Sequence, residues 1–240
     1  TLPLATLIGV EGGLALMVLA ARQLDRMEAV DEIEITQRTM ARSLERMERE
    51  VTSATVWDAA YAAIGHKVDD AWADSNFATY YRDQFSHDLT FVMRSGQVLY
   101  ASVGGVRTTS STLGAFPAKS VPIAAEISAD ARAARQAGRV SSAAEVTRTG
   151  LMRVDDTTYL VAFASVTPET LAGAKSYDGP PAVVISARRL DAPFVKRLAD
   201  DLGLDALAYG YPPNARTPRV LLKDEEIDWV VVESLLGRRS

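Results

Sequence analysis

Residues 57–102 read WDAAYAAIGHKVDDAWADSNFATYYRDQFSHDLTFVMRSGQVLYAS, and this stretch decides the fold. It opens on a Trp-Asp-x-x-Tyr pattern within a run of helix-forming residues, and Gly65 predicts the C-terminal end of that first helix. A second, aromatic-rich helix is expected to begin at a cap formed by Asp74 or Ser75 and to run to Phe85. Two β-rich runs follow across a Ser-Gly turn, so the stretch predicts two helices that lead into a β-hairpin.

The rest of the chain continues this alternation of β-rich runs and helices. The expected strands are Leu89–Met93, Val98–Ser102, Leu151–Val154, Thr158–Ser165 and Ala182–Ala187, with a terminal hairpin at Val220–Leu222 and Ile227–Val232. The expected helices are Ala124–Gly138 and Ala192–Leu202. Turn residues between neighbouring strands indicate antiparallel pairing. The prediction is an α+β fold, an antiparallel sheet flanked by helices as in PAS-like and Cache-like sensors.

The N-terminal region is a candidate membrane segment. Leu2–Ala21 is a twenty-residue run with a single charge, Glu11, and such a run at about 1.5 Å per residue matches the ~30 Å hydrocarbon core of a bilayer. The summed insertion preference of its large apolar side chains is at least as large as the cost of about 3 kcal/mol for one central acid. We therefore expect a transmembrane helix over residues 1–22. A signal peptide and a buried core helix are the alternatives.

Residues 23–56 are expected to form one long helix, because Leu24 to Ala54 contains neither Pro nor Gly. Apolar residues recur in this segment at alternating spacings of three and four. They are Val30, Ile33, Met40, Leu44, Met47, Val51 and Ala54, with Gln37 as the one polar exception. This heptad seam predicts either a parallel homodimer or a helix packed on the chain's own sheet. We expect the first, a helix that serves signalling and dimerisation.

The composition excludes several classes of function. The net charge is −5 and the pI is about 5.2, whereas nucleic-acid binding requires a concentrated basic face. The chain has no cysteine, which excludes disulfides, thiolate metal sites and cysteine nucleophiles. His66 and His87 lack a partner at metal-ligand spacing, no Ser or Thr lies in a nucleophile elbow, and His87 is expected at the surface or in a cap. We expect no enzyme activity, no cofactor, no metal site and no nucleic-acid partner.

The stretch from Trp57 to Ser102 resembles the CHASE domains of type four. In that family the Trp-Asp-x-x-Tyr pattern is followed by an Asn and later by a strand that ends in an Arg before Leu-Asp. The matching residues are Trp57, Asp58, Tyr61, Asn76 and Arg188. Arg189 is the neighbouring candidate for the last position. The resemblance implies an extracytoplasmic sensor domain over residues 57–235, in the periplasm and ahead of a cyclic di-GMP enzyme or a histidine kinase.

These five matching residues form the candidate ligand-binding site. Trp57 and Tyr61 lie one helical turn apart and share a face, with Asp58 beside them. Aromatic rings, an acid and a distant arginine suit a binding cleft, because pockets are mostly apolar with a few fixed polar groups. The alternative is structural: the rings fill the core between helix and sheet, and Asp58 pairs with Arg188 to stabilise the fold.

Two functions are compatible with these features. The first is the sensory input domain of a signalling protein in the bacterial inner membrane. It would bind an unknown small molecule or partner and pass a conformational change through a dimeric helix to a cytoplasmic output domain. This requires that the ligand binds one arrangement better than the other. The second is a membrane-anchored interaction or scaffold domain without a small-molecule ligand.

Overall fold

The computed structural model describes residues 35, 38–139 and 144–202, and the backbone of three strands between residues 207 and 234. The chain divides into two compact units. The larger comprises Ala41–Phe194 and Lys223–Trp229, and the smaller comprises Thr1–Met40, Val195–Leu222 and Val230–Ser240. The expected membrane span at residues 1–22 lies outside the described residues. Among the helices that are described, none is long and apolar enough to cross a membrane.

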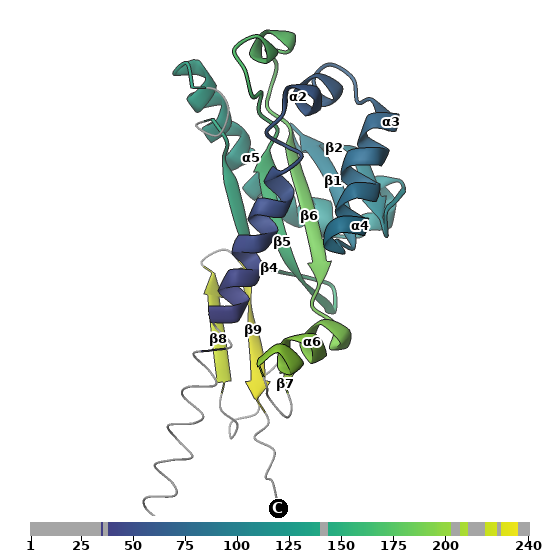
Figure 1. The fold of residues 1–240 in the computed structure, drawn as a ribbon, viewed down its shortest axis with the longest axis vertical. Coiled ribbons are helices and arrows are strands. Elements are labelled where there is room, and N and C mark those ends of the chain that lie inside the picture. Colours follow the sequence, from purple (N-terminus) through teal and green to yellow (C-terminus); the bar gives the residue numbers. More distant parts are fainter. Residues whose placement is uncertain are drawn as a thin grey trace, which may run out of the picture. The chain divides into compact units, whose positions relative to one another are not determined.

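The larger unit is built on a six-stranded antiparallel sheet (Figure 1). In spatial order its strands are β3 (Val106–Arg107), β2 (Gln97–Val103), β1 (Leu89–Arg94), β6 (Val183–Arg189), β5 (Thr157–Ser165) and β4 (Thr147–Val154). All five strands predicted for this region are confirmed, and β3 is added at one edge. The hairpin turns contain left-handed residues, with φ of 50° at Ser95 and 53° at Asp155. The pairing of β1 with β6 joins segments far apart in the chain, which local sequence does not specify.

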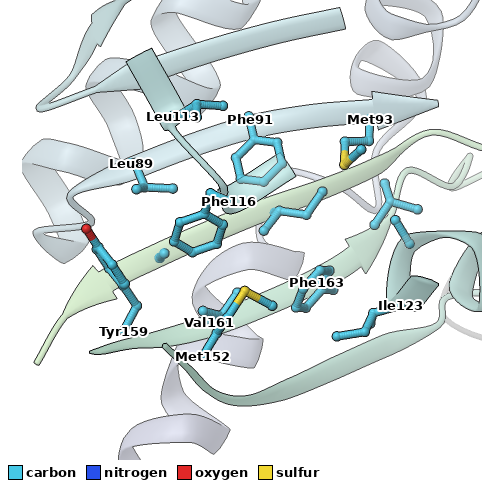
Figure 2. Packing of buried hydrophobic residues seen from close by; sticks show 14 of the residues in the cluster. Leu89, Phe91, Met93, Leu113, Phe116, Ile123, Met152, Tyr159, Val161 and Phe163 are labelled. Atoms are coloured by element: carbon cyan, nitrogen blue, oxygen red, sulfur yellow. The ribbon is translucent and has the colours of Figure 1, made fainter. Parts of the chain in front are cut away.

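One face of the sheet is covered by α5 (Phe116–Gln136), which begins earlier than predicted. The reason is a proline in its first turn, where the missing N–H removes no helical hydrogen bond. Alternate strand residues such as Phe91 and Phe163 point to this face and join one apolar cluster (Figure 2). The Phe116 ring lies 5.7 Å from that of Phe91 and 5.1 Å from that of Tyr159, both in edge-to-face geometry. Burial of these rings is the main stabilising contribution on this face.

The other face is covered by the helix over residues 41–52 and by a run of short helices. The short helices are α2 (Asp58–Ile64), α3 (Asp70–Ala73), the π-helical segment η1 (Asp74–Thr79) and α4 (Tyr80–Phe85). Figure 1 shows this run beside β1 and β2. Phe77 and Tyr81 are fully buried beneath it. The sheet is therefore the middle layer of the larger unit.

The long N-terminal helix ends at Thr52, before its predicted end at residue 56. The hydroxyl of Thr52 donates to the carbonyl of Arg49 at 3.0 Å, and the chain then turns so that Val56 pairs with Thr167 in a parallel bridge. Side-chain bonds of this kind compete with the helical ladder. The last three seam positions are 0–3% exposed within the single chain: Met47, Val51 and Ala54. At this end the heptad packs on the chain itself.

The aromatic helix begins at Asp70 rather than at Asp74 or Ser75. Asp69 is its cap, because its carboxylate accepts a hydrogen bond from the backbone N–H of Trp72 at 3.1 Å. The helix then widens into η1, where Asn76 donates its side-chain amide to the carbonyl of Trp72 at 2.9 Å. The prediction placed the cap too late because the π-helical register was not foreseen.

The C-terminal region contains α6 (Ala192–Leu202) and a three-stranded sheet. Its strands, in the order β7-β9-β8, are β7 (Leu207–Gly210), β9 (Ile227–Ser234) and β8 (Arg219–Asp224). The predicted helix and both strands of the predicted terminal hairpin are confirmed. β7, which pairs antiparallel with β9, was not predicted.

Candidate functional site

A groove-like cavity of about 520 Å³ lies between α5 and the neighbouring ends of β1 and β6, and we call it the α5 cavity. Met93 and Val183 line it from the sheet, and Pro180 and Pro181 line it from the loop that precedes β6. Its volume falls within the range of about 300–1,000 Å³ that is usual for small-molecule sites. Its lining is mostly apolar, so it suits a ligand with an apolar body.

The cavity exists because α5 presents small side chains where most amphipathic helices present large ones. These residues are Ala124, Ala125, Ser128, Ala129 and Ala133. Leucines at these positions would fill the space over the sheet. Ser128 also donates its hydroxyl to the carbonyl of Pro181 at 3.1 Å, which ties the loop to the helix. The sequence signal for the site was therefore visible as an alanine-rich helix face.

The loop between β5 and β6, residues 166–182, forms one wall of the cavity, and Asp58 holds its beginning. One carboxylate oxygen of Asp58 accepts from the backbone N–H groups of Glu169 at 2.8 Å and Thr170 at 3.0 Å. The other accepts from the Thr170 hydroxyl at 2.6 Å. The hydroxyl and then the backbone N–H of Thr170 lower the pKa of Asp58, because they favour its charged form. Asp58 thus acts as a clamp on the loop.

Tyr61 holds the far end of the same loop. Its hydroxyl donates to the carbonyl of Tyr177 at 2.7 Å and accepts from the guanidinium of Arg135 on α5. Arg135 also donates to the carbonyl of Gly179 at 2.7 Å. Burial raises the pKa of Tyr61, so it stays a neutral donor. The Asp and Tyr of the Trp-Asp-x-x-Tyr pattern, at the start of α2, therefore fix two points of the cavity wall.

Two arginines line the α5 cavity. Arg94 at the end of β1 donates to the carbonyl of Ile64, and its guanidinium lies 4.8 Å from the centre of the Tyr177 ring. Its Nε is buried and has no hydrogen-bond partner within the described chain. A buried donor in this state costs about 1–3 kcal/mol. Arg132 on α5 is exposed, and among the described residues it has no ion-pair or hydrogen-bond partner.

None of the five predicted site residues lines the α5 cavity in the described structure. Asp58 and Tyr61 both bond to the loop at residues 166–182, which forms one wall of the cavity. Trp57 is 42% exposed, and its ring centre lies 5.8 Å from that of Trp72. The side-chain amide of Asn76 makes a local hydrogen bond to the carbonyl of Trp72. Two of the predicted residues, Asp58 and Tyr61, support the candidate site, and the residues that line it were not predicted.

The predicted pairing of Asp58 with Arg188 is wrong. Asp58 bonds to the start of the loop, close to Thr167. This point is near the beginning of β6, where Val183 pairs with Ser165 at the end of β5. Arg188 is five residues further along β6, which corresponds to about 17 Å of extended strand. Its guanidinium lies 5.1 Å from the centre of the Phe194 ring. Asp58 therefore lies near the Val183 end of β6, and Arg188 lies near the other end of that strand.

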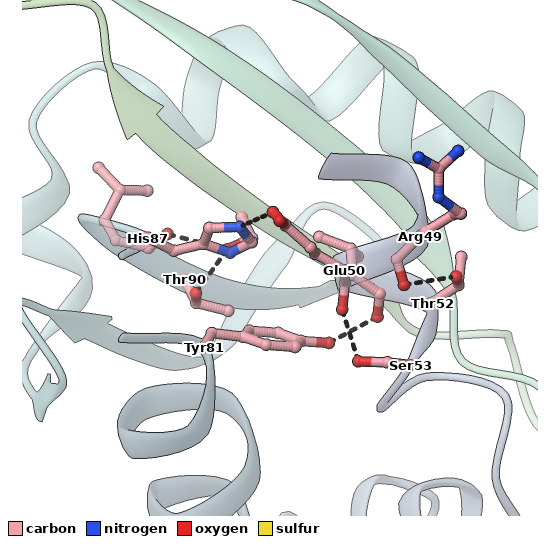
Figure 3. A network of polar contacts seen from close by, with 10 residues as sticks. Arg49, Glu50, Thr52, Ser53, Tyr81, His87 and Thr90 are labelled. Carbon is pink, nitrogen blue, oxygen red and sulfur yellow. Dashed lines mark hydrogen bonds and ion pairs between the residues drawn. The ribbon is translucent and has the colours of Figure 1, made fainter. Parts of the chain in front are cut away.

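A polar network joins the N-terminal helix to the sheet on the face away from α5 (Figure 3). The ring of His87 is 1% exposed, with Nε2 3.0 Å from a Glu50 carboxylate oxygen and Nδ1 2.7 Å from the Ser186 hydroxyl. Because a carboxylate only accepts, Nε2 donates to Glu50. Tyr81 donates its hydroxyl to the carbonyl of Val51 at 2.6 Å. The prediction of a surface or capping role for His87 is therefore wrong.

Comparison with known families identifies one match. The family model of the CHASE4 domain covers residues 39–209, which include every residue that lines the α5 cavity and both members of the loop clamp. No curated protein matches the chain. Within the described residues, no group of three or more His, Cys, Asp or Glu side chains is placed to hold a metal ion.

Proposed function

Because the chain belongs to the CHASE4 domain family of extracytoplasmic sensors found in signalling proteins, we propose that it is a periplasmic input domain that binds a small ligand in the α5 cavity. The ligand-induced change passes to the N-terminal helix and on to a cytoplasmic output domain, an enzyme of cyclic di-GMP turnover or a histidine kinase. The observation that carries the proposal is the cavity itself, which has the size and the largely apolar lining of a ligand site.

A backbone connection supports transmission from the cavity wall to the helix. The N–H of Thr167, at the start of the loop, donates to the carbonyl of Thr55 at 3.0 Å. The carbonyl of Thr167 accepts from the N–H of Trp57 at 3.2 Å. Thr55 and Trp57 immediately follow the N-terminal helix. A ligand that displaces the loop therefore acts directly on the segment where that helix ends.

The contact between Thr55–Trp57 and Thr167, which we call the helix joint, holds two buried hydroxyls. They support the idea that this contact has a second arrangement. Oγ1 of Thr55 and Oγ1 of Thr167 are both buried without a hydrogen-bond partner within the described chain. Each orphan costs about 1–3 kcal/mol in this arrangement. A shifted register that paired either hydroxyl would recover that cost. Under the proposal, this recovered cost narrows the free-energy difference between two arrangements, which a sensor requires to be small.

The proposal includes a parallel homodimer and an inner-membrane anchor. The anchor is the apolar run at residues 1–22. Met40 and the last seam positions, from Met47 onward, are already buried within one chain. The dimer contact is therefore placed on Leu44 and on Val30 and Ile33, which are seam positions before Met40. Leu44 is only half-buried in the single chain, which leaves its outer surface for a partner helix.

The test is native mass spectrometry of the purified 240-residue chain, followed by identification of any molecule that leaves it on unfolding. Ala129→Leu places a large side chain in the α5 cavity, so we expect the variant to lose the bound mass while it keeps the wild-type melting temperature. Ala118→Leu is the matched control, because Ala118 is an exposed alanine of the same helix outside the cavity lining. Retention of the ligand by Ala129→Leu would rule out this cavity as the site.

A further inference from the structure

The charges that line the α5 cavity are all of one sign. Its described lining contains Arg94 and Arg132 and no acidic residue. The two arginines come from different elements, the end of β1 and the C-terminal half of α5, so the fold brings together two cations that local sequence keeps apart. Two cationic side chains at a cavity whose own lining carries no carboxylate favour the binding of an anion there.

Arg94 is held in place, but not all of its N–H donors are paired within the described chain. Its bond to the carbonyl of Ile64 and its position over the Tyr177 ring hold the side chain still. The buried Nε nevertheless lacks a partner within the described chain. Because this Nε is closed off from solvent, a carboxylate in the cavity would meet the terminal N–H groups of the guanidinium, which form a fixed fork that suits a carboxylate.

Arg132 is the complementary group at the open side. It is exposed and has no partner in the described part of the chain, so it is free to close onto a ligand. It also lines a neighbouring hollow of about 370 Å³ that contains Arg135 and Asp178. In that hollow Arg135 is already bonded to Tyr61 and to the loop carbonyls. Arg132 is therefore the cavity's uncommitted cation.

Resting on the proposed function, we propose that the ligand of the α5 cavity is a small organic acid, with a carboxylate held between Arg132 and Arg94 and an apolar body against the alanine face of α5. The apolar lining from Met93, Val183 and the two prolines contributes affinity that a bare inorganic anion cannot use. The shape is a groove rather than a closed chamber, which suits a slender alkyl or aryl body.

The class is tested with matched pairs of probes on the full chain. Benzoate and hexanoate are titrated by calorimetry against benzamide and hexanamide, which keep the apolar body and lose the charge, and against inorganic phosphate, which keeps only charge. We expect both acids to bind more tightly than their amides and than phosphate, and Arg132→Gln to weaken the acids by about tenfold through the loss of a charged hydrogen bond. Arg46→Gln, an exposed arginine of the N-terminal helix, should leave binding unchanged.

The outcomes separate this inference from the proposed function. Equal binding of acids and amides, blocked by Ala129→Leu but unaffected by Arg132→Gln, would leave the cavity a ligand site and overturn the organic-acid class. Binding of neither acid would also overturn the class, and the proposed function would then rest on the molecule that co-purifies. Acid binding that survives Ala129→Leu would place the ligand elsewhere and contradict both.

Discussion

The two faces of the six-stranded sheet are built from different chemistry. The α5 face is an aromatic and aliphatic cluster that leaves a cavity beside the alanines of α5. The opposite face is covered by helices, and its contact with the N-terminal helix includes the buried hydrogen bonds of Glu50, His87 and Tyr81. An apolar cavity adapts to an occupant, whereas a satisfied polar network fixes one geometry. Under the proposed function, the α5 face binds the ligand and the opposite face passes the change to the N-terminal helix, through the loop at residues 166–182.

The largest effect is expected from the α5 face. Phe116 is 1% exposed and contacts the rings of both Phe91 and Tyr159. Phe116→Ala should lower the free energy of unfolding by about 3–5 kcal/mol, measured by urea denaturation. Leu171→Ala is the control, because Leu171 is 67% exposed. Similar losses in the two variants would show that the cluster does not dominate stability.

The polar face should give a smaller but more specific loss. His87→Phe keeps an aromatic ring but removes the hydrogen bonds to the Glu50 carboxylate and the Ser186 hydroxyl, of which only Ser186 keeps another side-chain partner among the described residues, Thr90. We expect a loss of about 1–3 kcal/mol, with faster hydrogen exchange in residues 46–52. His66→Phe is the matched control, because His66 is exposed and a Phe ring can keep its edge-to-face contact with Tyr177. A His87→Phe protein with wild-type stability and unchanged exchange in residues 46–52 would show that this network does not hold the helix on the sheet.

The joint between the faces should respond in the opposite direction. Thr55→Val replaces a buried hydroxyl that has no partner in the described chain with a methyl group of the same shape. We expect stability to rise by up to about 1 kcal/mol, seen as a higher melting temperature. Thr167→Val should behave alike, and Thr112→Val, whose hydroxyl is exposed and bonded to Thr108, should not. A clear loss of stability in either buried variant would mean that its hydroxyl is bonded after all.

The smallest effect is a pH dependence at the loop clamp. The pKa of Asp58 is lowered from 3.8 by its bonds to Thr170, so the folded state favours the charged form. Its contribution is therefore present above the unfolded pKa of about 3.9 and is lost as pH falls through the lower folded value. Denaturation measured between about pH 2 and pH 5 should show a shallower acid loss for Asp58→Asn than for wild type. Parallel curves would contradict the clamp.

Much of the architecture could be predicted from local patterns. The strands β1, β2, β4, β5 and β6 are marked by β-rich runs between turn residues, and turns such as Ser95-Gly96 are strong local signals. The loop clamp was found in part, because the Trp-Asp-x-x-Tyr pattern drew attention to Asp58 and Tyr61. These signals lie within a few residues of one another, which is the range over which sequence patterns are informative.

The cavity could not be predicted because it depends on contacts between distant segments. Arg94, Arg132 and Pro181 meet only after β1 pairs with β6 and α5 crosses the sheet. The same limit explains the wrong pairing of Asp58 with Arg188, since the register of β6 places the arginine at the far end of the strand. The burial of His87 also follows from tertiary packing, because its immediate neighbours in sequence, Ser86 and Asp88, are polar.

The measurement that tests the central claim most directly is hydrogen exchange of the chain with and without any molecule found to co-purify with it. The account predicts added protection at three places: α5, the loop at residues 166–182, and residues 46–57 at the end of the N-terminal helix. Asp58→Ala should keep the protection on α5 and lose it at the helix, because the loop is no longer clamped to α2. Protection confined to α5 and the loop in the wild-type chain, with the helix unchanged, would contradict the claim that the cavity signals through this joint.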